Sequence, residues 1–355
     1  MRPLATAALC CLLLTCMQCG LANACTSLCF DTPDGPIFAE NLDLLIPGDG
    51  LVFVNRRGLA KESYGKSTTG ETMKWVAEYG SVTFNLAGIE LPWGGMNEAG
   101  LVVGTMQLNS SECPRPDERP PLSEGLLVQY ALDTCADVEE AIAKISVVRL
   151  ARNECASHFL IADAEGNGAA IEFLDGRFVC HTGEDLPVKA MTNMRYERAL
   201  AALERGGPRW WWSNPGASAE RFAGAAARIE NYDASRDTSA VSYAFGTLVD
   251  VVAAPHTKWC VVYDIARREI HYGTVVSPPV KTLSLDAFDF SCDAPALMMD
   301  VNAPLEGNVE HALMPFDHAT NLRFFSTFCD RWGIKVSTEG AADLMRLFES
   351  FECVR

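Results

Sequence analysis

The sequence predicts an α+β fold, in which β-sheets stack face to face and helices cover their outer sides. Short β-like runs dominate the first hundred residues, a helical stretch follows, and strands and helices then return in separate blocks. Such segregation favours stacked sheets over a doubly wound parallel sheet, whose strands and helices alternate. Apolar residues make up 48% of the chain, which is ample for a packed core.

The early strands are bounded by turn signals such as Pro33-Asp34-Gly35 and Gly94-Gly95. Their predicted ranges are Thr26–Phe30, Pro36–Ala39, Leu51–Asn55, Val82–Asn85 and Leu101–Met106. Beyond them, apolar residues recur at helical spacing over Leu122–Val148, with a second helix start near Asp137.

The second half of the chain continues in blocks. A Glu-Gly-Asn-Gly turn at 165–168 joins two predicted strands, which indicates a hairpin. The predicted elements are strands His158–Ala162 and Ala169–Phe173, helices Arg195–Leu203 and Ala217–Ile229, and strands Lys258–Asp264 and Glu269–Thr274. One domain over residues 25–355 is the simplest organisation.

The N-terminus has the features of a signal peptide. Arg2 gives a positive start, Leu4–Met17 is apolar, and Ala22-Asn23-Ala24 supplies a small-x-small cleavage signal. The apolar run is too short for a membrane span, which needs roughly 20 residues. We therefore expect residues 1–24 to be removed and the protein to be exported, either periplasmic or secreted.

Charge and cysteine content exclude several classes of function. The net charge of −17 argues against binding nucleic acid or anionic membranes. Four of the 14 cysteines leave with the leader, and the other ten lack the paired spacing of a zinc site. We expect no metal and no cofactor. An oxidising compartment would permit disulfides, but their pairing cannot be read from the sequence.

Cys25 would become the first residue after cleavage at Ala24. It could then be half of a disulfide, a lipid-anchored cysteine or a nucleophile. The lipoprotein signal prefers Leu three residues earlier, whereas Leu21 lies four earlier. An N-terminal cysteine carries its own base, an α-amine with a pKa of about 7.7–8.0, which suits proton transfer at neutral pH.

Five segments together resemble the choloylglycine hydrolase family, which includes bile salt hydrolases and penicillin V acylases. The first, CTSLCFDTPDGPIFAENLDL, begins at Cys25. The others follow in the family's order: GGMNEAGLVV at 94–103, TNMRYERAL at 192–200, ASAERF at 217–222 and TKWCVVYDIARREIHY at 257–272. The resemblance implies an αββα four-layer sandwich of the N-terminal nucleophile hydrolase type.

The resemblance also implies roles for four residues. Cys25 falls on the nucleophile and Asp43 on the aspartate that positions its amine and thiol. Asn193 falls on the oxyanion donor, and Arg221 falls on the arginine that organises the site through charged hydrogen bonds. Each also has a plain structural alternative.

By those alternatives, Asp43 ends a strand, Asn193 caps the following helix, and Arg221 pairs with Glu220 or Glu230 on the surface. His158, beside Phe159 in a strand, is expected to be a satisfied core residue rather than a base.

Two positions depart from the family pattern. Glu40 stands where the relatives have an arginine near the thiol, and Gln107 stands where they have an asparagine. We expect both to contact substrate. A carboxylate at Glu40 would disfavour thiolate formation and would repel anionic substrates.

The predicted function is hydrolysis of a linear amide through a thioester on Cys25, with a small-molecule N-acyl amide as substrate. Relatives form tetramers, so a homo-tetramer is expected. The acyl group is expected to be apolar, because large side chains in these segments could border the site: Trp75, Phe84, Trp93 and Met106. The alternative is an exported binding protein or lipoprotein on the same scaffold that has lost catalysis.

Overall fold

A computed structural model describes residues 24–67, 69–151, 156–205, 218–237, 239–252 and 256–354. Apart from Ala24, the predicted leader lies outside these residues. Within them, no helix is both long and apolar enough to cross a membrane.

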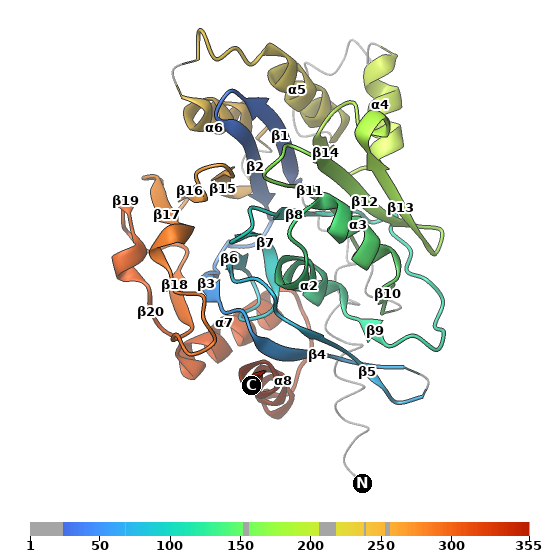
Figure 1. Cartoon of the computed structure of the whole chain (residues 1–355), viewed down its shortest axis with the longest axis vertical. Helices are drawn as coiled ribbons and strands as arrows, with labels where there is room; N and C mark the ends of the chain where they lie inside the picture. The colour runs from blue at the N-terminus through green and yellow to red at the C-terminus, as the bar shows by residue number, and fades with distance from the viewer. Residues whose placement is uncertain are drawn as a thin grey trace.

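Two large sheets form the centre of the molecule (Figure 1). The seven-stranded sheet runs in the order β14 (Ala190–Thr192), β1 (Thr26–Thr32), β2 (Gly35–Asp43), β15 (Thr257–Asp264), β16 (Glu269–Thr274), β17 (Lys281–Ser284) and β19 (Gly307–Asn308). The nine-stranded sheet runs in the order β13 (Arg177–Thr182), β12 (Gly168–Leu174), β11 (Ser157–Ala162), β8 (Val102–Gln107), β7 (Pro92–Asn97), β6 (Ser81–Asn85), β3 (Leu51–Asn55), β18 (Leu297–Asp300) and β20 (Met314–Pro315).

The two sheets pack face to face through aromatic and small residues. Phe84 of β6 meets Tyr272 of β16 edge-on, with 5.1 Å between ring centroids. Further along, Gly94 of β7 and Gly104 of β8 leave space for Glu40 of β2; a Cβ at either glycine would lie within 2.7 Å of its carboxylate oxygens. These contacts define the inner layers of the sandwich.

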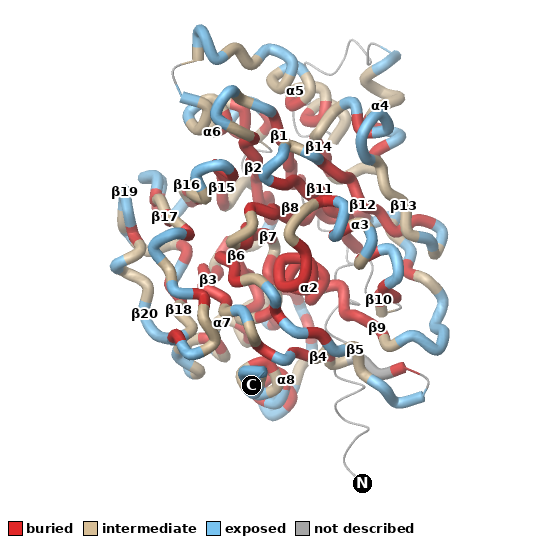
Figure 2. Tube along the Cα trace, in the orientation of Figure 1, coloured by how far each residue is buried: buried red, intermediate tan, exposed pale blue. Residues whose placement is uncertain are grey.

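Helices cover both outer faces. On the seven-stranded sheet, α5 packs against β1 and β14, and α6 packs against β2 and β15. On the nine-stranded sheet, α2 packs against β7 and β8, and all of its residues are buried (Figure 2). The helices are α2 (Leu127–Thr134), α3 (Val138–Ser146), α4 (Tyr196–Glu204), α5 (Ser218–Asn231), α6 (Ala240–Asp250), α7 (His318–Arg331) and α8 (Thr338–Glu349). The αββα sandwich predicted from the sequence is confirmed.

Local chemistry explains where several elements begin and end. The Asp137 side chain accepts a hydrogen bond from Glu140 N and starts α3, as the predicted second helix start required. Gly166 has φ +84° in the predicted hairpin turn between β11 and β12, a conformation that glycine adopts without strain. The sequence missed several strands, among them β4 (Leu59–Lys66), β5 (Thr72–Val76) and β14.

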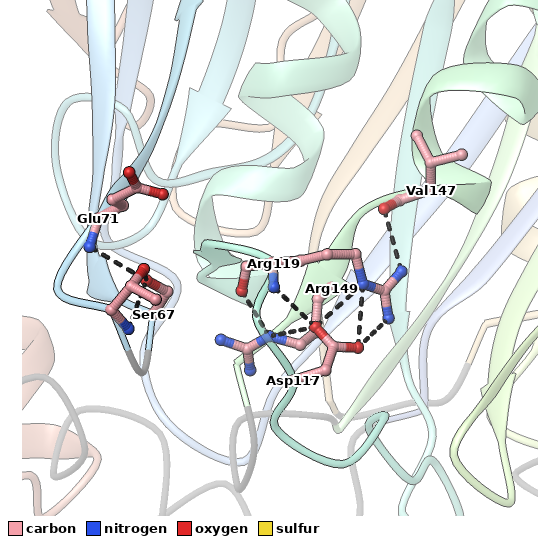
Figure 3. Close-up of polar contacts among 7 residues, drawn as sticks. Ser67, Glu71, Asp117, Arg119, Val147 and Arg149 are labelled. Atoms are coloured by element: carbon pink, nitrogen blue, oxygen red, sulfur yellow. Dashed lines mark hydrogen bonds and ion pairs between the residues drawn. The ribbon is translucent and has the colours of Figure 1, made fainter.

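Two small sheets and a disulfide lie outside the two large sheets. β4 pairs with β5 and with β21 (Glu352–Cys353), and a disulfide joins Cys353 to Cys292. Figure 3 shows Arg119 bound to Asp117 and to the carbonyl of Val147, just before the strand pair β9 (Pro121–Leu122) and β10 (Arg149–Leu150). In the same view Arg149 donates to the carbonyl of Arg119, which ties the 108–120 loop to β10.

Candidate active site

Three neighbouring strand ends bring the predicted site residues together. Cys25 directly precedes β1, which lies between β14 and β2 in the seven-stranded sheet. Thr26 pairs with Thr192 on one side and with Asn41 on the other. Because both neighbours run antiparallel to β1, their C-terminal ends place Asn193 and Asp43 beside Cys25.

Arg221 reaches this point from α5. Its Nη1 donates to the carbonyl of Cys25 at 2.5 Å and to Thr26 Oγ1 at 2.7 Å. Its Nη2 donates to Asn193 Oδ1 at 2.9 Å and to Ser218 Oγ at 3.2 Å. The side chain is 2% exposed, so the surface-partner alternative is wrong. Burial lowers the pKa of Arg221, and the nearby charges of Asp43 and Cys25 oppose that shift.

The Cys25 thiol is fully buried. It donates to the carbonyl of Asp43 over 3.8 Å. Burial raises the pKa of Cys25 far above its ordinary value, and the Asp43 charge adds to this effect. The backbone hydrogen bond and the Arg221 charge act in the opposite direction. With a peptide bond on its amino side, the cysteine is therefore held as a neutral thiol.

Asp43 ends β2 and is fully buried. Burial raises its pKa to about 6, although the Thr257 hydroxyl and the Arg221 guanidinium work against the shift. Among the described residues, neither carboxylate oxygen accepts a hydrogen bond of normal geometry. A buried carboxylate in this condition is costly, and its charge acts on the neighbouring Cys25 thiol.

Asn193 does not cap a helix. The residue that precedes α4 is Arg195, and no side chain caps the helix from that position. Asn193 instead donates through Nδ2 to the carbonyl of Gln107 at 2.8 Å while accepting from Arg221. An asparagine amide has two N–H groups, so one remains for a ligand.

Glu40 is 4% exposed and lies between the two sheets. Its Oε1 accepts from the Tyr263 hydroxyl at 2.9 Å. Burial raises the pKa of Glu40 to about 8, against the opposing effect of that hydrogen bond. At neutral pH the group is mostly uncharged, so the repulsion of anions expected from the sequence loses its physical basis.

One pocket adjoins Asn193 and Arg221, and a second lies further along the nine-stranded sheet. A polar pocket of about 400 Å³ is lined by Ala24, Gln107, Asn193, Arg195, Arg198 and Arg221 among others, and among the described residues no carboxylate lines it. A narrow apolar pocket of about 100 Å³ is lined by Trp93, Thr105, Ser157, Phe159, Phe328 and Trp332 among others. Ser157 of the apolar pocket pairs with Gln107 of the polar pocket across β8 and β11, so the two linings come next to each other at this strand pair.

Several participants were missed in the sequence. Thr26 and Ser218, which accept hydrogen bonds from Arg221, lie inside the first and fourth motif segments but carry no signal of their own. Arg195 and Arg198 lie inside the TNMRYERAL segment, where two arginines three residues apart could have indicated a basic wall. Of the expected bordering side chains, Trp93 lines the apolar pocket, while Trp75, Phe84 and Met106 belong to the core.

Glu40→Gln should remove a pH-dependent loss of stability. A raised pKa in the folded state, about 8 against an ordinary 4.5, means that stability is complete below pH 4.5 and is lost as the pH rises towards 8. Urea unfolding should therefore show the variant gaining about 2–5 kcal/mol on wild type between pH 4.5 and pH 9. The exposed Glu71→Gln is the control and should follow wild type. Parallel curves for wild type and Glu40→Gln would contradict the buried geometry.

Comparisons with known proteins agree with this geometry. A family model described as acyl-coenzyme A:6-aminopenicillanic acid acyl-transferase matches residues 82–207. Penicillin V acylase of Pectobacterium atrosepticum is 24% identical over 315 residues, covering 76% of this chain and 82% of that protein.

Solved structures extend the similarity to the fold. Penicillin V acylase from Agrobacterium tumefaciens has a TM-score of 0.70 at 23% identity, covering 82% of this chain and 98% of its own. A variant of the conjugated bile acid hydrolase from Clostridium perfringens has a TM-score of 0.64 at 14% identity, covering 81% and 99%. The predicted resemblance to the choloylglycine hydrolase family and its N-terminal nucleophile fold is confirmed.

Proposed function

We propose that this protein hydrolyses linear amides, as a penicillin V acylase or a bile acid hydrolase does, with Cys25 as an N-terminal nucleophile. The observation that carries the proposal is the convergence of Cys25, Asp43, Asn193 and Arg221 at one strand end. Export with removal of residues 1–24 would release the α-amine on which the mechanism depends.

The vacant oxygens of Asp43 support the role of that amine. A free α-ammonium at Cys25 would bring a positive charge and new N–H donors to a buried carboxylate whose oxygens accept no hydrogen bond of normal geometry from the described residues. The amine would then favour the Cys25 thiolate, because an adjacent positive charge lowers a thiol pKa. Asp43 would hold the amine in one orientation for proton transfer.

The reaction follows in two halves. The α-amine takes the thiol proton, and the sulfur attacks the substrate carbonyl to form a tetrahedral intermediate, whose oxyanion accepts the second N–H of Asn193. The C–N bond then breaks as the α-ammonium returns the proton to the leaving amine, which leaves a thioester on Cys25. Water, deprotonated by the same amine, hydrolyses the thioester and releases the acid.

The activation step can be tested by the N-terminus of the protein. Purified active enzyme should begin at Cys25 by intact mass. A matched protein that retains Ala24 should stay folded but lose turnover, since its Cys25 nitrogen is a peptide amide. Full turnover in the extended protein would overturn the mechanism, and an acylated Cys25 would indicate a lipoprotein instead.

Substitutions at Asn193 and at Cys25 should lower turnover to different extents. Cys25→Ala should abolish turnover, and Asn193→Ala should lower kcat by roughly 10²–10³-fold, the usual cost of losing one oxyanion donor. Melting temperature serves as the control measurement and should change little in both variants. A surviving kcat per folded molecule in Asn193→Ala would refute the oxyanion role.

The two pockets suggest which amides fit. The apolar pocket would take the acyl group, with aromatic side chains from β7 and from α7 on its walls. The polar pocket would take the leaving group, and it is lined by the exposed Arg198 and the half-buried Arg195. Among the described residues Arg198 forms no ion pair, whereas Arg195 lies 4.0 Å from the exposed Asp175. This arrangement favours an amine that carries a carboxylate.

Arg198→Gln should therefore act on substrate charge. Wild type should prefer N-(phenoxyacetyl)glycine to the neutral N-(phenoxyacetyl)glycinamide. The variant should lose about 5-fold in kcat/KM for the anion alone, which corresponds to roughly 1 kcal/mol for a partly exposed pair. Arg346→Gln, on α8 at the other end of the molecule in Figure 1, is the matched control. Equal losses on both substrates would contradict this assignment.

A further inference from the structure

Glu172 is a buried acid that the mechanism above does not use. It lies in the middle of β12 and is fully buried. Both of its oxygens lie 3.2 Å from the backbone nitrogen of Tyr196, whose N–H they accept. Its Oε1 is also 3.1 Å from Nδ1 of His158, which is equally buried. Glu172 thus joins the nine-stranded sheet to the start of α4.

Tyr196 is the first residue of α4, and its N–H has no partner within the helix. The preceding residue, Arg195, supplies no side-chain cap. Glu172 takes the place of that cap from β12 of the nine-stranded sheet, with both side-chain oxygens at the N-terminal end of the helix. The α4 start is therefore fixed by a long-range contact and not by its own sequence.

Asn193 lies between this fixed helix start and the end of β14. Thr192, the residue before it, pairs with Thr26 in the seven-stranded sheet. Tyr196, three residues after it, is held by Glu172. With both ends of the 193–195 turn fixed, the Asn193 amide can bond Arg221 and the Gln107 carbonyl together. A shift of the turn by about 1 Å would misplace an oxyanion donor.

We propose that Glu172, held by His158, is a positioning residue that fixes the Asn193 amide by anchoring the N-terminus of α4. The inference rests on the proposed oxyanion role of Asn193. The groups that face Glu172 agree with it: His158 from β11, and His181 from β13 with its Nε2 at 3.8 Å. The His181 ring also stacks on Tyr196 with 4.9 Å between centroids. His158 is a core residue, as expected from the sequence, but it is only partly satisfied: Nδ1 meets Glu172, while Nε2 has no hydrogen-bond partner among the described residues.

Two substitutions separate this role from general packing. Glu172→Gln keeps an oxygen acceptor at the same reach, so the bond from Tyr196 N should survive. Glu172→Asp keeps the charge but is one methylene shorter and should not reach Tyr196. We expect kcat to stay within about 3-fold in Glu172→Gln and to fall about 10–100-fold in Glu172→Asp, with KM within 2-fold in both. Glu197→Gln, an exposed acid in the first turn of α4, is the matched control.

Two further readouts make the test independent of substrate choice. Hydrogen exchange over residues 193–199 should accelerate in Glu172→Asp and not in the control. Alkylation of Cys25 by iodoacetamide should keep its wild-type rate in all variants, because the nucleophile is not touched. Faster hydrogen exchange in Glu172→Asp supports the anchoring of α4 by Glu172 even if the wild-type protein hydrolyses no amide. Absence of hydrolysis would refute the proposed function but not the anchoring. Two results would overturn the positioning role. One is a hydrogen-exchange rate over residues 193–199 in Glu172→Asp that equals the wild-type rate. The other is a fall in kcat that is accompanied by slower alkylation of Cys25.

Discussion

The buried guanidinium of Arg221 is the contact on which the site depends. It joins the carbonyl of Cys25, the hydroxyl of Thr26, the amide of Asn193 and the hydroxyl of Ser218 in one set of charged hydrogen bonds. These groups come from β1, the end of β14 and α5, which meet in the upper part of Figure 1. The planar guanidinium of arginine has several N–H donors in fixed directions and can donate to all four acceptors, whereas the single ammonium of a lysine cannot.

This contact also sets the electrostatics of the site. One buried positive charge faces the Asp43 carboxyl and the Cys25 thiol, and desolvation works against the charge on all three. Removing one member of such a group leaves an uncompensated charge, which is far more costly than the group itself is stabilising. An additional cation at the Cys25 nitrogen would shift the balance towards the ionised forms of Asp43 and Cys25. This charge pattern is the one that the proposed mechanism, with a free amine at Cys25, requires.

The sequence predicted the strands that carry the site because they are apolar and bounded by clear turns, as β2, β8 and β15 are. It missed β14, which is only three residues long. Motif order predicted Cys25, Asp43, Asn193 and Arg221, but not the direction in which a strand residue points. Glu40 was expected to face substrate, whereas Gly94 and Gly104 on the opposite sheet leave the space that it occupies. Contacts between strands that are distant in the sequence determine which way such a side chain points, and the sequence pattern within one strand does not predict these contacts.

The charge in the polar pocket is opposite in sign to the net charge of the chain. The chain carries a net charge of −17, yet the part of it that the structure describes lines the polar pocket with arginines and with no carboxylate. A negative surface slows the approach of anions at long range, while arginines within the pocket act at short range, where salt screens them less. Meanwhile Glu40 and Glu172 are withdrawn into the sandwich and bonded to Tyr263 and Tyr196. These two acids therefore serve the architecture of the site, and in the proposed function the arginines of the α4 segment recognise the charge of the substrate.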